Sequence, residues 1–151
     1  VEIVPGNHDG GLANIAPDTV KFHESVGCTI GNIGFCHGHA WPSQEVMNSE
    51  ILVMGHEHPA FSFRDRVDKL HSEPCWLRAP MIEHERYERV PDLLIVMPAF
   101  GELAGRTMNR EPLKGLGPIL RNGLADLSKA RVETLEGLEF GELGNLLDLR
   151  L

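Results

Sequence analysis

The sequence predicts an α/β fold, a layered sandwich to which this chain contributes mostly β-structure. Two short and wholly apolar runs, Ile51–Met54 and Leu93–Met97, are typical of central strands that are buried on both faces of a sheet. Shorter alternations of apolar and polar residues predict further strands, and helix signals are few. An all-β sandwich is the alternative that these observations leave open.

The first part of the chain is expected to contain four strands. Val1–Val4 is predicted to form a central strand that leads into a Gly-rich loop. Val20–His23 alternates apolar and polar side chains like a short strand. Cys28–Ile30 and Ile33–Cys36 are separated by two residues, Gly31-Asn32, and this spacing predicts a β-hairpin.

The middle of the chain carries one helix signal between strands. Ser43 is a favourable N-cap residue, and we expect a short helix from there to about Ser49. The run Ile51–Met54 then predicts a buried strand that ends abruptly at a glycine. Phe61–Val67 alternates again and predicts another strand.

The last part of the chain has weaker patterns. Residues 80–91 are dense in charge, which predicts a solvated excursion between strands. Leu93–Met97 is the second buried strand, whereas residues 101–128 show few periodicities. Val132–Leu135, followed by a turn at Glu136-Gly137, is the last strand that the sequence predicts.

Length and composition fit a single globular domain over residues 1–151, with 42% hydrophobic and 24% charged residues. The formal net charge of -8 argues against nonspecific nucleic-acid binding driven by phosphate neutralisation. No apolar run approaches the roughly 20 residues of a spanning helix, so no membrane association is expected. The three cysteines, Cys28, Cys36 and Cys75, show no pair spacing, which predicts a reducing compartment and therefore the cytoplasm. The oligomeric state is left open.

Five of the eight histidines lie in three tight motifs, each placed where an apolar strand ends. The motifs are Gly6-Asn7-His8-Asp9, Cys36-His37-Gly38-His39 and Gly55-His56-Glu57-His58. Imidazole nitrogen and amide oxygen together suit Mn, Fe or Zn, and α/β sheets bind ligands outside the carboxyl ends of their strands. A single His-x-His is more often a surface feature, but three such motifs in this order predict a metal centre.

The three motifs together resemble the C-terminal half of the signature of the calcineurin-like metallophosphoesterase superfamily. The surrounding residues, such as His37-Gly38-His39-Ala40-Trp41-Pro42 and Met54-Gly55-His56-Glu57-His58-Pro59, look most like archaeal SbcD-related phosphoesterases. The similarity covers about residues 1–100. The resemblance implies a hydrolase acting on phosphoester bonds, with a phosphodiesterase or nuclease-like activity on nucleotides or nucleic acid.

The family also implies a four-layer α/β/β/α sandwich and two divalent ions that activate a water molecule. Mn is expected first, with Fe, Zn or Ni as alternatives. By motif, the second metal is held by Asn7, His37 and His56, and the first metal by His58. His8 would face the phosphate and protonate the leaving oxygen, and Asp9 would orient its imidazole.

The sequence departs from the family at one point. The Asp-x-His and Gly-Asp-x-x-Asp motifs that supply the remaining ligands are absent. We therefore expect the chain to be the C-terminal part of a longer protein, an incomplete domain that is inactive alone. The alternative is a metal-poor, non-catalytic module of the same fold that serves in binding or scaffolding.

Four residues beside the motifs have weaker expectations. His39 is either a group near the substrate or a turn-stabilising histidine, and Glu57 is expected to be a solvated carboxylate. Trp41 is expected to anchor its loop, with stacking on a base as the alternative. Cys36 is expected to be a small core hydrophobe.

Overall fold

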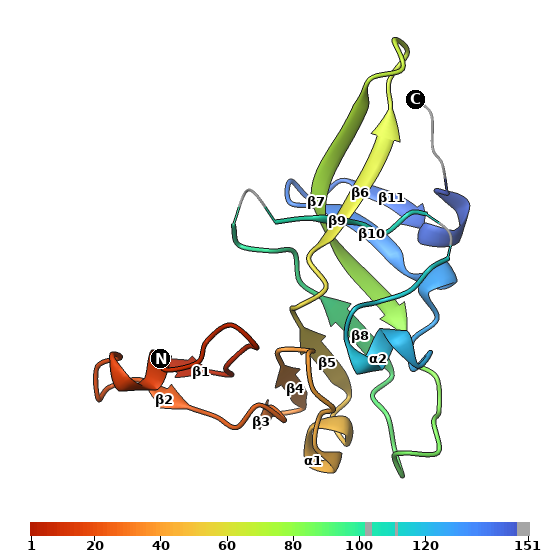
Figure 1. Cartoon of the computed structure of the whole chain (residues 1–151). Helices are drawn as coiled ribbons and strands as arrows, with labels where there is room; N and C mark the ends of the chain where they lie inside the picture. Colours follow the sequence, from red (N-terminus) through yellow and green to blue (C-terminus); the bar gives the residue numbers. More distant parts are fainter. Residues whose placement is uncertain (102–103, 111, 148–151) are drawn as a thin grey trace.

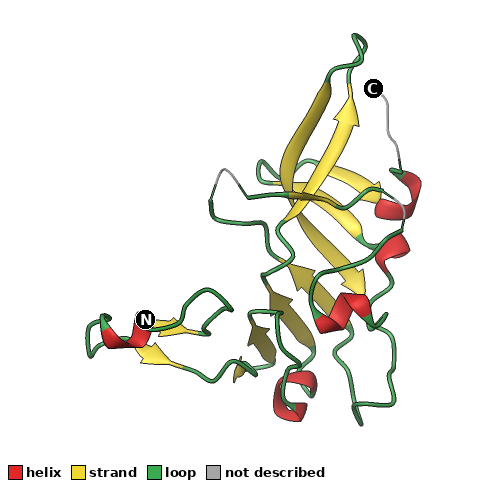
Figure 2. Ribbon diagram, in the orientation of Figure 1, coloured by secondary structure: helices red, strands yellow, loops and turns green. Residues whose placement is uncertain are grey.

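The computed structural model describes residues 1–101, 104–110 and 112–147, and β-strands dominate them (Figures 1 and 2). The strands are β1 (Glu2–Ile3), β2 (Lys21–Phe22), β3 (Cys28–Ile30), β4 (Ile33–Cys36), β5 (Ile51–Met54), β6 (Pro59–Arg64), β7 (Leu70–Pro80), β8 (Leu93–Val96), β9 (Arg106–Thr107), β10 (Arg131–Thr134) and β11 (Glu139–Glu142). The helices are α1 (Gln44–Met47) and α2 (Pro118–Arg121), with 3-10 turns η1 (Leu12–Asn14), η2 (Leu127–Lys129) and η3 (Leu143–Asn145).

Within this described part, nine strands form one mixed sheet. The main order is β11-β10-β7-β8-β5-β4-β3, and β6 joins it through β7 and carries β9 on its other edge. β1 and β2 form a separate parallel pair that lies to one side of the sheet (Figure 1). The expectation of a mostly-β chain is confirmed. The helical layers of an α/β sandwich are not shown among the described residues, where each helix has only three or four residues.

Three neighbouring parallel strands, β4, β5 and β8, organise the centre of the sheet. Their register places Cys36, Met54 and Val96 in one row across the strands, and all three side chains are buried. The same core cluster includes buried residues of α1, of α2 and of the segment after it. The side chains at the alternate positions of β4, β5 and β8 point to the opposite face, where they are only half-buried. We call this second face the open sheet face; it consists of Ile33, Phe35, Ile51, Val53, Leu93 and Ile95.

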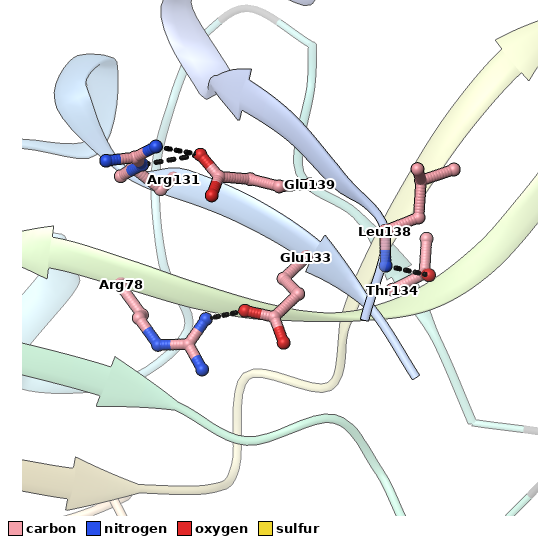
Figure 3. Close-up of polar contacts among 6 residues, drawn as sticks. All are labelled: Arg78, Arg131, Glu133, Thr134, Leu138 and Glu139. Carbon is pink, nitrogen blue, oxygen red and sulfur yellow. Dashed lines mark hydrogen bonds and ion pairs between the residues drawn. The ribbon is translucent and has the colours of Figure 1, made fainter. Parts of the chain in front are cut away.

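Strand β7 is long enough to serve two parts of the sheet. Its first half pairs with β6, and its second half lies between β8 and β10. Ion pairs support the outer strands: Arg78 pairs with Glu133 across β7 and β10, and Arg131 pairs with Glu139 across β10 and β11 (Figure 3). Thr134 accepts a hydrogen bond from the backbone of the following turn, which closes the β10–β11 connection.

Local chemistry explains the elements that the sequence predicted best. The β3–β4 hairpin turns at Gly31, whose φ of 62° suits the two-residue turn. Helix α1 begins after Ser43, whose hydroxyl accepts a hydrogen bond from the Val46 amide, and it ends two residues earlier than predicted.

Three expectations need correction. β1 pairs with β2 and is not a central strand of the described sheet. β7 was not predicted, although it is the longest described strand. The strand Val132–Leu135 is followed by β11, so it is not the last. In the described ranges no helix has the length or the apolar character needed to cross a membrane.

Candidate metal centre

The ends of β4 and β5 bring two of the three His motifs together. These strands are parallel neighbours, so their carboxyl ends lie at the same edge of the sheet. His37 directly follows β4, and His56 follows β5 by one glycine. Their imidazole ring centroids are 5.2 Å apart. A backbone hydrogen bond of 3.1 Å from the Gly55 amide to the His37 carbonyl continues the pairing past the strand ends.

The loop after β1 brings the third motif to the same place. Asn7 Oδ1 lies 3.1 Å from His37 Nε2. The loop approaches this closely because Gly6 has no side chain: a Cβ at this position would lie 2.7 Å from Cε1 of the His37 ring. Asn7, His37 and His56, the three predicted ligands of one metal, are therefore brought together from segments far apart in the chain.

His56 and His58 adopt a backbone conformation that L-amino acids rarely use. Their φ angles are 65° and 49°, both in the left-handed region. Such residues concentrate at functional sites and persist only where the surrounding structure fixes them. His58 belongs to this turn as predicted, and its carbonyl accepts a 2.7 Å hydrogen bond from the Arg106 amide.

The pKa values indicate a cluster of imidazoles that share one environment. Burial, followed by the charges of His56 and His39, lowers the pKa of His37 to about 4, and Asp9 opposes this shift. Burial also lowers the pKa of His56, and His39 and His58 contribute to it. His37 is consequently neutral near pH 7, which is the form of imidazole that binds metals.

His39 belongs to the cluster more closely than the sequence indicated. Its ring centroid lies 5.2 Å from that of His37 and 6.1 Å from that of His56. Its Nδ1 atom is buried without a hydrogen-bond partner. A signal existed in the sequence, because His37 and His39 flank a glycine at a strand end, but the spacing alone did not distinguish a cluster member from a turn-stabilising residue.

Glu57 corrects another expectation. It was predicted to be solvated, but its side chain is fully buried. Its carboxylate accepts hydrogen bonds from the backbone amides of Leu116 (2.7 Å) and Gly117 (2.8 Å) and from the Arg106 guanidinium (3.3 Å). These partners come from a segment about sixty residues away, and no local pattern announces them.

The two predicted catalytic residues lie in the loop that carries Asn7. The His8 side chain is exposed, and its charge contributes to the lowered pKa of His56, so it lies within electrostatic range of the cluster. Asp9 Oδ2 accepts a 2.6 Å hydrogen bond from the Gly6 amide and thereby closes the turn. No hydrogen bond joins the Asp9 and His8 side chains among the described residues.

One pair of the predicted donors has the spacing of two ligands of the same ion. Two atoms that bind one ion at about 2.1 Å each lie about 3 Å apart, close to the separation of Asn7 Oδ1 and His37 Nε2. The unpartnered Nδ1 of His39 and the neutral His37 also suit such an ion. In the part of the chain that the structure describes, however, no group of three or more His, Cys, Asp or Glu residues is arranged to hold a metal ion. The carboxylate of Glu57 is fully engaged elsewhere.

The remaining residues near the motifs have structural partners. The Arg86 guanidinium lies 4.3 Å from the centroid of the Trp41 ring, and the Tyr87 hydroxyl donates to the Pro42 carbonyl at 2.8 Å. These contacts favour the loop-anchor interpretation of Trp41. Cys36 is a buried core residue as expected, and burial raises the pKa of its thiol to about 12.

No protein-family model, curated protein or solved structure matches this chain.

Proposed function

We propose that this chain carries part of the active site of a metal-dependent phosphoesterase. The observation that carries the proposal is the convergence of three distant motifs: Asn7 Oδ1 lies 3.1 Å from His37 Nε2, and the His56 ring centroid lies 5.2 Å from that of His37. A loop, the end of β4 and the end of β5 meet in the order and with the residue types of the C-terminal half of the metallophosphoesterase signature. The left-handed conformations of His56 and His58 support the same location.

The ion ligands proposed for this chain are Asn7, His37 and His56 for one ion and His58 for another. Divalent ions, Mn²⁺ first, would place positive charge at the phosphate oxygens and lower the pKa of a bound water. The chain supplies the neutral donors, because burial holds His37 in its uncharged form. It also supplies a position for the phosphate at the sheet edge where the strands β4 and β5 end.

His8 is the proposed general acid. Its side chain is exposed and close enough to affect His56 electrostatically, so it is the available imidazole for protonating a leaving oxygen. Asp9 positions it through the backbone: the hydrogen bond from Gly6 to the Asp9 carboxylate fixes the turn from which His8 projects.

A cavity of about 420 Å³ beside the cluster supports a substrate with an aromatic group, such as a nucleotide. Its lining includes His39 from the cluster, Trp41 and Arg121. Trp41 anchors its loop through Arg86, and as a lining residue it also offers the cavity an aromatic group of the kind that stacks on a base, while the Arg121 guanidinium is of the kind that attracts a phosphate. They offer this attraction locally, although the chain as a whole has a net charge of -8.

The finer architecture and the compartment belong to the same proposal. The parallel order of β4, β5 and β8 is compatible with the C-terminal part of a four-layer α/β/β/α sandwich. The cysteines Cys28, Cys36 and Cys75 are all free thiols, which supports a cytoplasmic location.

Metal titration tests the proposal directly. We expect calorimetry with Mn²⁺ to give one weak binding event for this chain, and His37→Ala or His56→Ala to abolish it. His71→Ala is the matched control, because His71 lies on the β6–β7 hairpin and bonds to Asp65. Retention of Mn²⁺ binding in both cluster variants would refute the ligand assignment. Two tight Mn²⁺ equivalents per chain would refute the expectation of a single weak event.

A non-catalytic binding module is the second candidate. The observation in its favour is that no three metal-ligating groups are already arranged around an ion in the described ranges. The two candidates differ in a hydrolysis assay with bis(nitrophenyl) phosphate and Mn²⁺ on a longer protein that supplies the Asp-x-His and Gly-Asp-x-x-Asp motifs, because this chain is expected to be inactive alone. Hydrolysis that is lost in His56→Ala supports the enzyme, whereas nucleotide binding without Mn²⁺ dependence and without turnover supports the module.

A further inference from the structure

The turn Gly55–His58 holds two histidines in left-handed conformations with one ordinary residue between them. Histidine enters the left-handed region more often than most residues with a side chain, but two such residues in one turn, with φ angles of 65° and 49°, are still uncommon. Conformations of this kind persist only where the surroundings determine them. The residue between the two histidines, Glu57, is the part of the turn with the strongest partners.

Glu57 is fully buried and uses both carboxylate oxygens. Oε1 accepts from the Gly117 amide at 2.8 Å, and Oε2 accepts from the Leu116 amide at 2.7 Å and from Arg106 at 3.3 Å. Bonds of this type, with one charged partner, are the strong class of protein hydrogen bond. Both oxygens of this carboxylate therefore bind the later segment, and these bonds hold the turn in place.

Arg106 binds the same turn through both its backbone and its side chain. Its backbone amide donates to the His58 carbonyl at 2.7 Å, and its guanidinium donates to Glu57 and, at 2.5 Å, to the Lys114 carbonyl. The turn is therefore attached at Glu57 and at His58 to two pieces of the later chain, Arg106 and residues 114–117, which we together call the clasp segment.

Backbone packing continues the contact to the neighbouring His loop. A Cβ at Gly117 would overlap the Gly38 carbonyl group, and a Cβ at Gly115 would lie 2.9 Å from Glu57 Oε1. Gly38 separates His37 from His39, and its own Cβ would lie 3.2 Å from the Cβ of His56. The clasp segment thus lies against both histidine loops at distances that only glycine permits.

We infer that Glu57 is a positioning residue, which fixes His56 and His58 by fastening their turn to the clasp segment. This gives the clasp segment a role in the candidate site, although it carries no recognisable motif. The effect of Glu57 on metal binding rests on the proposed function; its effect on the conformation of the turn does not.

The experiment compares Glu57→Ala and Glu57→Gln with Asn109→Ala in the full chain. Asn109 is the matched control, because it is equally buried and makes three hydrogen bonds to the backbone of Ser62 and Leu146, outside the site. Glu57→Gln keeps an acceptor for one of the two backbone amides, so it retains the fold if Glu57→Ala does not. The first readout is the NMR coupling between the amide and α protons of His56 and His58, which reports φ without any metal present. The second is Mn²⁺ affinity.

We expect both Glu57 variants to shift the couplings of His56 and His58, and to weaken Mn²⁺ binding by about 10–100-fold, the usual effect of removing a partner outside the ligand shell. Asn109→Ala should lower stability with both readouts unchanged. Unchanged couplings in a folded Glu57 variant overturn the inference, as do equal shifts in Asn109→Ala. Shifted couplings in a chain whose wild type binds no Mn²⁺ support the positioning role and refute the proposed function instead.

Discussion

Gly117→Ala tests whether the clasp segment really packs against the His37–His39 loop. The added Cβ would lie 3.0 Å from the carbonyl carbon of Gly38 and closer still to its oxygen. Carbon atoms in contact prefer about 3.5–4.0 Å, so the two backbones must separate by at least about 0.5 Å. Both partners are backbone atoms, so no rotamer change relieves the overlap.

The expected cost has two parts. Overpacking of this kind costs about 1–3 kcal/mol. The displacement also weakens the 2.8 Å hydrogen bond from the Gly117 amide to the buried Glu57 carboxylate, a class of bond with a net contribution of about 1.5–3 kcal/mol. We therefore expect the free energy of unfolding to fall by about 2–4 kcal/mol, a large share of the roughly 5–15 kcal/mol of a typical domain. For a chain of this length the melting temperature should drop by roughly 4–16 °C.

Urea unfolding followed by circular dichroism measures this change. Gly101→Ala is the control, because no atom of the described residues lies within 4 Å of its added Cβ and its φ is not in the left-handed region. That substitution should leave the free energy of unfolding within about 0.5 kcal/mol of the wild type, or raise it slightly. A Gly117→Ala variant that unfolds at the wild-type urea concentration would show that the close packing on Gly38 does not exist.

Three further outcomes follow from the site, the core and the surface. In an active phosphoesterase, His8→Ala should slow turnover of an ester with a poor leaving group by about 10²–10⁴-fold, and much less for a nitrophenyl ester, at unchanged metal content. A disulfide reagent at about pH 8 should label Cys28 first, whereas Cys75, whose pKa burial raises to about 12, should react only on unfolding. The open sheet face should drive self-association, which Ile95→Lys should reduce in sedimentation velocity at matched concentrations.

Each of these three predictions has a result that would contradict it. Equal rate losses for both esters together with lost metal would make His8 structural. Labelling of Cys75 in the native chain at the rate of Cys28 would contradict its burial. A wild-type chain that sediments as a monomer at all concentrations would show that the half-buried row Phe35, Val53 and Ile95 is adequately covered.

The sequence predicted those strands whose pattern is local and strong. The runs that became β5 and β8 are apolar at every position, which fits strands flanked by partners on both sides. The strand β7 was not predicted because Pro74 interrupts its pattern and because its two halves pair with different strands. β11 has no buried residue and therefore no apolar pattern to detect.

The candidate site also has a part that the sequence predicted and a part that it did not. The motifs after β4 and β5 could be placed together because neighbouring parallel strands end at one edge, whereas the Asn7 motif follows β1 of a separate strand pair and sheet order does not place it. The role of Glu57 could not be foreseen. A carboxylate between two histidines has the appearance of a solvated residue, and its partners Leu116 and Gly117 offer only backbone amides, which carry no signal in the sequence. Burial of a charge depends on distant donors, and local patterns do not report them.

The packing of the Gly6 loop is connected with the chemistry of His37. Because Gly6 has no side chain, its backbone lies against the His37 imidazole and helps to remove the ring from water. That burial is the first cause of the lowered pKa, and the neighbouring imidazoles His56 and His39 add to it. The loop that brings the Asn7 oxygen to 3.1 Å from His37 thus packs on a ring whose burial lowers its pKa, while Asp9 of the same loop acts in the opposite direction. The glycine beside the asparagine therefore admits a second donor atom next to an imidazole that is in the neutral form that binds cations.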